Sequence, residues 1–306
     1  MKRFLLKSSV VLLAFAGTLC ILICGAYKTE LRILERDLTC PTNIVAAVVG
    51  DSRVETYFDP AEIPWMRNFG ESATPLPITA QKARMVARLN PHLKILVIDV
   101  WPNNFFSCLR CPIGAASPFG CALLEIMTRK DMPKISDGFE TRLIRGVMVP
   151  GLTHMLFGDE NAKSQLAGGF FKNAKMLEFG IRPEYAHMMP FPPPESPYSL
   201  DVNPLPADGE IVLNHLLDAL SIYDLKVVLT TTPILWIDQR WTKETLEWFE
   251  NKMTEIAERH HVPWHNWLHE YQDKADYWAD GAHFNDIGAK AFSREKRKVF
   301  EQYLAP

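Results

Sequence analysis

The chain has 306 residues, of which 47% are hydrophobic, 23% charged and 11% aromatic, and its formal net charge is −3. These are the values of an ordinary globular protein. They exclude a disordered or collagen-like chain and allow a core of normal density without metal or disulfide staples. The nearly balanced charge argues against a nucleic-acid partner, because such proteins usually present a basic face.

An uncharged segment lies near the start of the chain. Residues 8–27 contain no charged side chain over 20 residues, which is long enough for a helix to cross a bilayer. The basic residues Lys2, Arg3 and Lys7 precede this segment. Positive charge on that side predicts that the N-terminus stays in the cytoplasm and that the rest of the chain is exported. We therefore expect residues 1–27 to form a cytoplasmic tip and a transmembrane signal anchor.

A cleaved signal peptide is the alternative interpretation of the same segment. Ala14-Phe15-Ala16 has the small-x-small form of a cleavage site. Cleavage there would leave the apolar stretch 18–24 near the new N-terminus, which favours the uncleaved anchor. The expected location is therefore a single-pass membrane protein whose main domain lies on the periplasmic or extracellular side.

Five short segments in the remaining chain are expected to be strands, three of them with the apolar pattern of buried strands. They span residues 44–49, 65–69, 93–100, 226–231 and 262–264. Helical patterns span residues 78–89, 242–260 with Thr242 as N-cap, and a last helix from Asn285 or Asp286 to about residue 303. This alternation predicts an α/β fold with a mainly parallel sheet over residues 43–306. Residues 28–42 are expected to form a juxtamembrane helix or linker.

A large insertion is expected between two of these strands. About 125 residues separate the strand at 93–100 from the strand at 226–231, far more than one crossover needs. We assign the excess to an insertion at about residues 105–208. Its part at 190–206 contains seven prolines and is therefore expected to be an extended loop. Long loops of this kind are commonly lids or binding surfaces, and a stabilising appendage is the alternative.

Two motifs place chemically useful side chains at the same edge of the predicted sheet. Ser52 follows the first strand in Gly50-Asp51-Ser52, and Asp280-Gly281-Ala282-His283 lies after the last strand. His283 can take the proton of a serine hydroxyl, and Asp280 can orient the imidazole and stabilise the cation that forms. Helix capping by Asp51 and Ser52 and an ordinary surface loop at 280–283 are the alternatives.

An oxyanion site would complete this chemistry, because acyl transfer needs donors aimed at the developing negative oxygen. Gly70, at the end of the second strand, offers a backbone N–H, and Asn103 or Asn104, after the third, offers a side-chain amide. The alternative is ordinary turn chemistry, in which Gly and Asn are frequent.

These four blocks resemble, in order, those of the SGNH/GDSL hydrolase superfamily. The blocks are Gly50-Asp51-Ser52, Gly70 in NFGES, Asn103 in WPNN and Asp280-x-x-His283, and the resemblance spans about residues 44–300. It implies a flavodoxin-like three-layer α/β/α sandwich with Ser52 as nucleophile, His283 as base and Asp280 as orienter. It also implies an oxyanion hole formed by the N–H groups of Ser52 and Gly70 and the side chain of Asn103, without a cofactor.

The chain departs from the family pattern at two points. The third block usually reads Gly-x-Asn-Asp, whereas this chain has Trp101-Pro102-Asn103-Asn104, so the choice between the two asparagines stays open. Arg53 follows the nucleophile where an apolar residue is common in the family.

The anchored, exported architecture resembles a subset of that family that works beside membrane-bound O-acyltransferases on surface polysaccharides. The expected function is a serine acyl-ester hydrolase or O-acyltransferase acting on surface glycan or other acyl esters. A membrane-bound O-acyltransferase is a candidate partner by the same resemblance. The alternative function is a non-catalytic accessory domain that binds glycan or a membrane partner, and hydrolysis and transfer both remain open.

Other chemically conspicuous residues favour structural roles. Four cysteines follow the anchor and are expected to form structural disulfides, whose connectivity stays open: Cys40, Cys108, Cys111 and Cys121. Four histidines gather near a predicted strand but lack the spacing of metal ligands: His260, His261, His265 and His269. Three tryptophans are expected in the core or at its rim: Trp236, Trp241 and Trp248.

Overall fold

The structure is a computed structural model. It describes residues 17–18, 21–22, 24–25, 28–29, 31–71, 74, 76–102, 105, 208–235 and 241–304. Most of the predicted anchor and nearly all of the predicted insertion lie outside these residues. Residues 31–38 are helical, within the segment at 28–42 where the sequence predicts a helix or a linker. Within the described ranges, no helix has both the length and the apolar character needed to span a membrane.

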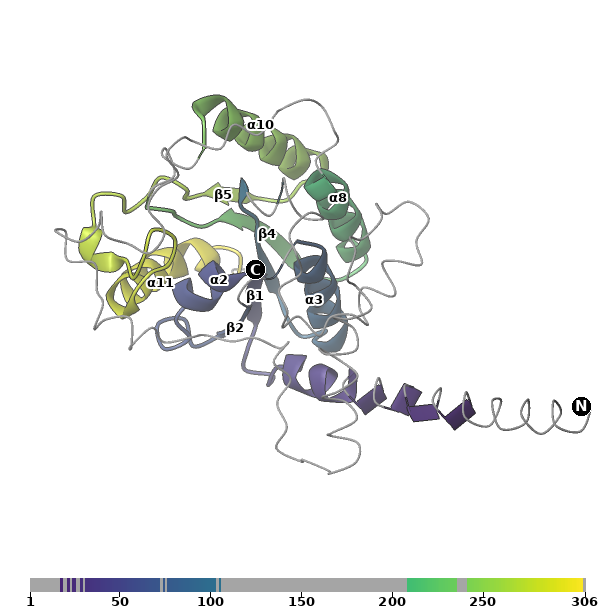
Figure 1. Cartoon of the computed structure of the whole chain (residues 1–306). Coiled ribbons are helices and arrows are strands. Elements are labelled where there is room, and N and C mark those ends of the chain that lie inside the picture. Colours follow the sequence, from purple (N-terminus) through teal and green to yellow (C-terminus); the bar gives the residue numbers. More distant parts are fainter. Residues whose placement is uncertain are drawn as a thin grey trace, which may run out of the picture. The chain divides into compact units, whose positions relative to one another are not determined.

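A parallel sheet of five strands forms the centre of the unit that begins at Leu38 (Figure 1). The strands are β1 Ala46–Gly50, β2 Met66–Gly70, β3 Ile95–Asp99, β4 Lys226–Thr231 and β5 Trp264–Asn266, in the order β2-β1-β3-β4-β5. Gly50 pairs with Gly70, and Asp99 pairs with Thr230. The carboxyl ends of these strands therefore meet at one edge of the sheet, as the sequence predicts.

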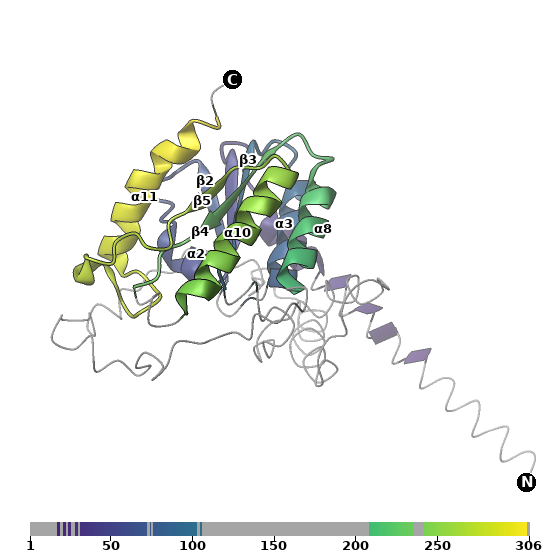
Figure 2. The same ribbon diagram turned by 90° about the horizontal axis from the view of Figure 1, so that it is seen from above.

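Helices cover both faces of the sheet (Figures 1 and 2). They are α2 Ser52–Tyr57, α3 Leu76–Leu89, α8 Asp208–Leu220, α10 Lys243–Arg259 and α11 Asp286–Glu301. α3 and α8 pack together on one face, and α2 and α11 pack together on the other. α10 contacts α8 and β5. The α/β fold with a parallel sheet, predicted from the alternation of elements, is thus confirmed.

The core under α2 and α11 is rich in aromatic side chains. Phe58 at the end of α2 contacts Phe292 of α11, with ring centroids 5.3 Å apart. Tyr57 stacks on Phe284, which precedes α11, at 4.2 Å. All four rings are almost completely buried. This core joins the helix that follows β1 to the segment that precedes α11, and so fixes two chain regions more than 220 residues apart.

Several helix boundaries follow the sequence signals. The side chain of Thr242 accepts a hydrogen bond from the N–H of Thr245 and caps α10 as predicted. Of the two candidates for the cap of α11, the structure selects Asn285, whose side chain accepts the N–H groups of Ile287 and Gly288.

The structure differs from the sequence analysis in two elements. β5 begins at Trp264, two residues after the predicted start, because His261 has a positive φ of 53° and the chain is still turning there. α8 was not predicted, although its buried leucine and valine side chains follow a helical spacing: Val212, Leu213, Leu216, Leu217 and Leu220.

Cys40 is a free thiol in the structure, which differs from the disulfide predicted for it. Its side chain is buried, and burial raises the pKa of the thiol to about 11, so the neutral thiol is strongly favoured. The backbone N–H of Cys40 donates to the side chain of Asn90 at 2.6 Å, and Asn90 in turn donates to the carbonyl of Leu38. Cys108, Cys111 and Cys121 lie outside the described residues.

Candidate active site

Ser52 is the first residue of α2 and directly follows the turn after β1. The side chain of Asp51 caps this helix by accepting the N–H of Arg53 at 3.0 Å. Gly50 allows the tight change of direction, because a Cβ there would clash with the side chain of Val54 and lie 3.1 Å from Cβ of Asp99. The strand, the glycine and the cap together place the Ser52 hydroxyl at the carboxyl edge of the sheet.

Three side chains form a continuous hydrogen-bonded chain at this edge. Oγ of Ser52 lies 2.8 Å from Nε2 of His283, and Nδ1 of His283 lies 2.7 Å from Oδ2 of Asp280. The other oxygen of Asp280 accepts the backbone N–H groups of Ala282 and His283, at 2.7 and 2.9 Å. With Nδ1 donating to the carboxylate, the lone pair of Nε2 faces the serine hydroxyl. The structure thus brings together the three residues that the sequence analysis grouped.

The Asp280 carboxylate is held in its ionised form. Burial acts to raise the pKa of Asp280, but the hydrogen bond and charge of His283 and the two backbone N–H groups outweigh burial, so its pKa is lowered. The side chains of His283 and Asp280 remain 28% and 27% exposed, respectively. An ionised carboxylate behind a partly exposed imidazole suits a base that must accept a proton and become a cation.

The loop that carries Asp280 and His283 is held at both ends. The N–H of Ala279 donates to the carbonyl of His283 at 2.8 Å, and Trp278 pairs with Phe284 in an antiparallel bridge. Asn285 caps α11 with its oxygen, and its amide donates to the carbonyl of Asp276 at 2.7 Å. The imidazole therefore projects from a short closed loop whose ends are tied to each other and to α11.

The oxyanion donors are only partly as predicted. Among the described residues we find no hydrogen-bond acceptor for the backbone N–H of Ser52, so this donor is available next to the nucleophile. The N–H of Gly70 instead donates to the side-chain oxygen of Asn68 at 2.7 Å. Asn103 and Asn104 lie outside the described residues.

The strand pairing explains the correction at Gly70. The N–H of Glu71 crosses to β1 and donates to the carbonyl of Gly50 at 3.2 Å. Because successive N–H groups of a strand point to opposite sides, the N–H of Gly70 faces away from β1. Gly70 is required for packing instead, since a Cβ there would lie 2.7 Å from Cα of Glu55 in α2. We therefore do not retain Gly70 as an oxyanion donor.

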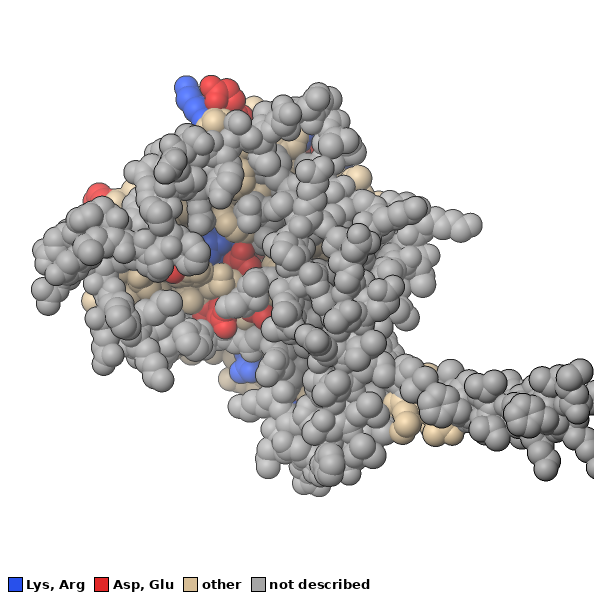
Figure 3. Space-filling view, in the orientation of Figure 1, with Lys and Arg blue, Asp and Glu red and all other residues tan. Residues whose placement is uncertain are grey.

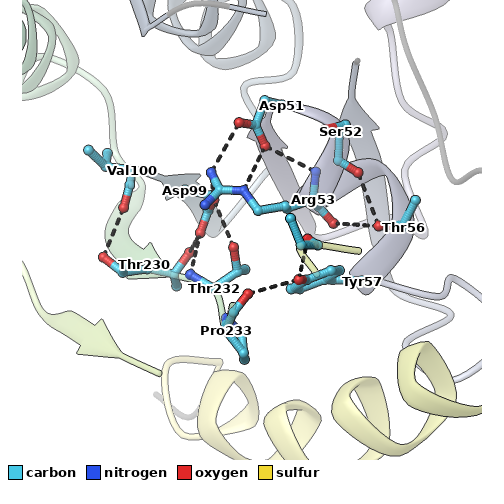
Figure 4. Close-up of polar contacts among 12 residues, drawn as sticks. Asp51, Ser52, Arg53, Thr56, Tyr57, Asp99, Val100, Thr230, Thr232 and Pro233 are labelled. Carbon is cyan, nitrogen blue, oxygen red and sulfur yellow. Dashed lines mark hydrogen bonds and ion pairs between the residues drawn. The ribbon is translucent and has the colours of Figure 1, made fainter. Parts of the chain in front are cut away.

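A buried charged cluster that the sequence analysis did not predict lies beside Ser52 (Figure 4). The guanidinium of Arg53 is only 2% exposed and contacts two carboxylates: Nη2 lies 3.0 Å from Oδ2 of Asp51 and 3.3 Å from Oδ2 of Asp99. Its Cζ also lies 3.9 Å from the centre of the Trp101 ring, a cation–π distance. The cluster joins the start of α2 to the end of β3.

Asp99 is further held by the end of β4. Its Oδ1 accepts the backbone N–H of Thr232 at 2.9 Å and the hydroxyl of Thr230 at 3.2 Å. Burial raises the pKa of Asp99 to about 6, although the charge of Arg53 and the threonine hydrogen bonds oppose this effect. Two features of the sequence could have indicated this cluster: an arginine directly after the proposed nucleophile, Arg53, and an aspartate at the end of an apolar strand, Asp99.

Charged atoms of both signs also lie together near the centre of the molecular face drawn in Figure 3, which has the orientation of Figure 1.

The four clustered histidines and three tryptophans of the sequence analysis do not form a common site in the described part of the chain. Nε2 of His265 hydrogen-bonds to the hydroxyl of Tyr303, whereas Nε2 of His260 hydrogen-bonds to Asn214. Within the described ranges, no three His, Cys, Asp or Glu side chains are arranged to hold a metal ion. Trp241 is buried in a small apolar cluster, Trp248 contacts Phe105 edge-to-face, and Trp236 lies outside the described residues.

No known family model matches this chain, and no curated protein matches it in sequence. The geometry at the carboxyl edge of the sheet is therefore the observation from which function is inferred.

Proposed function

We propose that this protein is a serine acyl-ester hydrolase or O-acyltransferase that forms an acyl-enzyme on Ser52. The observation that carries the proposal is the chain from Oγ of Ser52 through His283 to Asp280, with contacts of 2.8 and 2.7 Å. A capping serine or a surface loop has no need of an imidazole with this orientation. Its two ring nitrogens face a hydroxyl on one side and an ionised carboxylate on the other.

The proposed reaction has two half-reactions. Nε2 of His283 takes the proton of Ser52 while Oγ attacks the ester carbonyl, and the protonated imidazole then gives that proton to the departing alcohol. In the second half, His283 takes a proton from water or from an acceptor hydroxyl as that oxygen attacks the acyl group. The imidazolium then returns the proton to Oγ of Ser52 as its bond to the acyl group breaks. Asp280 stabilises the imidazolium in both half-reactions. The N–H of Ser52 donates to the oxyanion, and the side chain of Asn103 or Asn104 is the second proposed donor.

We also propose that the chain belongs to the SGNH/GDSL hydrolase superfamily and has its three-layer α/β/α sandwich. The strand order β2-β1-β3-β4-β5 supports this, because it is the order of flavodoxin-like sheets. The direction of the connections reverses between β1 and β3, and doubly wound folds bind ligands at that point. Ser52 follows β1, and Asn103 follows β3 in sequence. The insertion at about residues 105–208 is part of the same proposal.

The location and the substrate belong to the proposal as well. The uncharged segment at 8–27 and the basic residues before it support a membrane anchor with the domain exported. That architecture favours surface glycan or another extracytoplasmic acyl ester as the substrate, and a membrane-bound O-acyltransferase as a partner.

Labelling with a fluorophosphonate tests the nucleophile directly. We expect the full chain to be modified at Ser52, as identified by peptide mass spectrometry, and the Ser52→Ala variant to remain unlabelled. Ser221→Ala is the matched control, because the Ser221 hydroxyl is exposed and only donates to the carbonyl of Asp218. An unlabelled folded wild type would contradict the proposal and favour the non-catalytic accessory role.

A second experiment separates hydrolysis from transfer. The protein is incubated with an aryl acetate and a panel of oligosaccharides, and the products are weighed by mass spectrometry. Free acetate alone indicates a hydrolase, whereas an oligosaccharide that is 42 mass units heavier, about the mass of one added acetyl group, indicates an acyltransferase.

A further inference from the structure

We propose that Tyr57 is a positioning residue that sets the distance between Ser52 and His283. This inference rests on the proposed function, because it concerns the same pair of side chains. Tyr57 is the last residue of α2, the helix that begins with Ser52. Its side chain is fully buried and reaches the loop that carries His283.

The hydroxyl of Tyr57 lies between two backbone carbonyls. Its oxygen is 2.7 Å from the carbonyl oxygen of Ala282 and 2.8 Å from that of Pro233, and Figure 4 shows the contact with Pro233. Ala282 directly precedes His283, and Pro233 follows the end of β4. Among the described residues, no other group donates to either carbonyl. A phenol has one proton, so this single donor serves two acceptors, one at the buried Pro233 and one at the partly buried Ala282.

The ring of Tyr57 holds the other side of the same loop. It stacks on Phe284, which directly follows His283, with centroids 4.2 Å apart and planes inclined by 26°. Its edge also meets Trp278 at 6.4 Å. The residues immediately before and after His283 therefore both contact Tyr57, one through the hydroxyl and one through the ring.

Through these contacts, α2 constrains the position of the His283 imidazole. Ser52 and Tyr57 stand at opposite ends of one six-residue helix, so the serine cannot move far without the tyrosine. Tyr57 in turn fixes the main chain on both sides of His283. Burial raises the pKa of the Tyr57 hydroxyl well above its ordinary value, so the hydroxyl keeps its proton and remains a donor. The 2.8 Å contact between Ser52 and His283 is thus set partly by a residue whose hydroxyl bonds to backbone carbonyls rather than to either side chain of that pair.

The test is Tyr57→Phe, which keeps the ring and removes the donor. Tyr271→Phe is the matched control, since the Tyr271 ring packs on Phe284 in the same cluster but its hydroxyl contacts the carboxylate of Glu295. With an aryl acetate as substrate, we expect Tyr57→Phe to lower kcat about 10- to 100-fold and leave KM within about twofold, because small displacements of catalytic groups cost that much. Tyr271→Phe should change neither.

A second measurement needs no turnover. Ser52→Ala removes the partner of Nε2 and should move the ring ¹⁵N signal of His283. We expect that movement to be at least halved in the Tyr57→Phe background, where the serine and the imidazole are no longer held together. An equal movement in both backgrounds would overturn the inference, as would an unchanged kcat in Tyr57→Phe.

The two measurements also separate this inference from the proposed function. A wild type that neither reacts with a fluorophosphonate nor hydrolyses the ester refutes the function, while the ¹⁵N signal of His283 still decides the role of Tyr57.

If Tyr57→Phe fails to fold, 4-fluorophenylalanine at position 57 replaces it, because fluorine fills the hydroxyl volume without donating. At the same position, 4-aminophenylalanine supplies N–H donors and should restore kcat. Failure of that rescue in a folded protein would count against positioning.

Discussion

The buried carboxyl group of Asp99 makes a definite prediction about how stability depends on pH. Its pKa is raised from the ordinary 3.8 to about 6, mainly because burial penalises the charged form. Between these two values the folded protein therefore binds more protons at this site than the unfolded chain does. The free energy of unfolding contributed by Asp99 must then fall as the pH rises from about 4 to about 6.

The magnitude follows from the size of the shift. A difference of about 2 pKa units corresponds to about 3 kcal/mol between the protonated and ionised forms. Asp99→Asn removes the titration while keeping a side chain of the same shape. The stability of the variant relative to the wild type should therefore rise by about 2–3 kcal/mol between pH 4 and pH 7, whatever the stability of the variant at either pH.

Urea denaturation at a series of pH values, followed by tryptophan fluorescence, measures this difference. Asp224→Asn is the control, because the Asp224 side chain is exposed, and its stability curve should run parallel to that of the wild type. Parallel curves for the wild type and Asp99→Asn would refute the reasoning, since they would mean that Asp99 does not titrate in this range.

Two further substitutions test the site and its support. Asp280→Asn should lower kcat on an aryl acetate about 10³- to 10⁴-fold, because an amide favours the wrong tautomer of His283; a loss below tenfold would contradict the assigned role. Gly70→Ala should destabilise the fold by about 1–3 kcal/mol in urea denaturation, because its Cβ would press against the backbone of α2 at Glu55; an unchanged midpoint would contradict this packing.

The catalytic candidates could be predicted because their signals are local. Ser52 directly follows a buried apolar strand, and Asp280 and His283 lie on one loop before the last helix. In a parallel sheet the carboxyl ends of the strands share one edge, so these motifs had to approach each other. This conclusion does not depend on the register in which the strands pair. The sequence pattern also predicted the boundaries of four strands to within about two residues.

The supporting contacts could not be predicted because they depend on registers and distances across the fold. The direction of the Gly70 N–H depends on how β2 pairs with β1, which the pattern of residues does not specify. Tyr57 meets Pro233 and Ala282 across 176 and 225 residues of sequence, and Arg53 meets Asp99 across 46. A tyrosine or an arginine in a short helix gives no indication of such partners.

The ion pair with Asp99 gives a physical reason for an arginine after the proposed nucleophile, which is unusual for the proposed family. Asp51 and Asp99 place two carboxylates beside the start of α2, where the proposed reaction develops a further negative charge on an oxyanion. An apolar residue at position 53 would remove the ion pairs that Arg53 makes with both carboxylates, and removing one partner of a buried ion pair costs about 3–5 kcal/mol. Arg53 contacts both carboxylates and lowers the cluster charge from −2 to −1 when Asp99 is ionised. The same side chain links α2 to the end of β3, so the position of Ser52 and the electrostatic potential around it depend on one buried cluster.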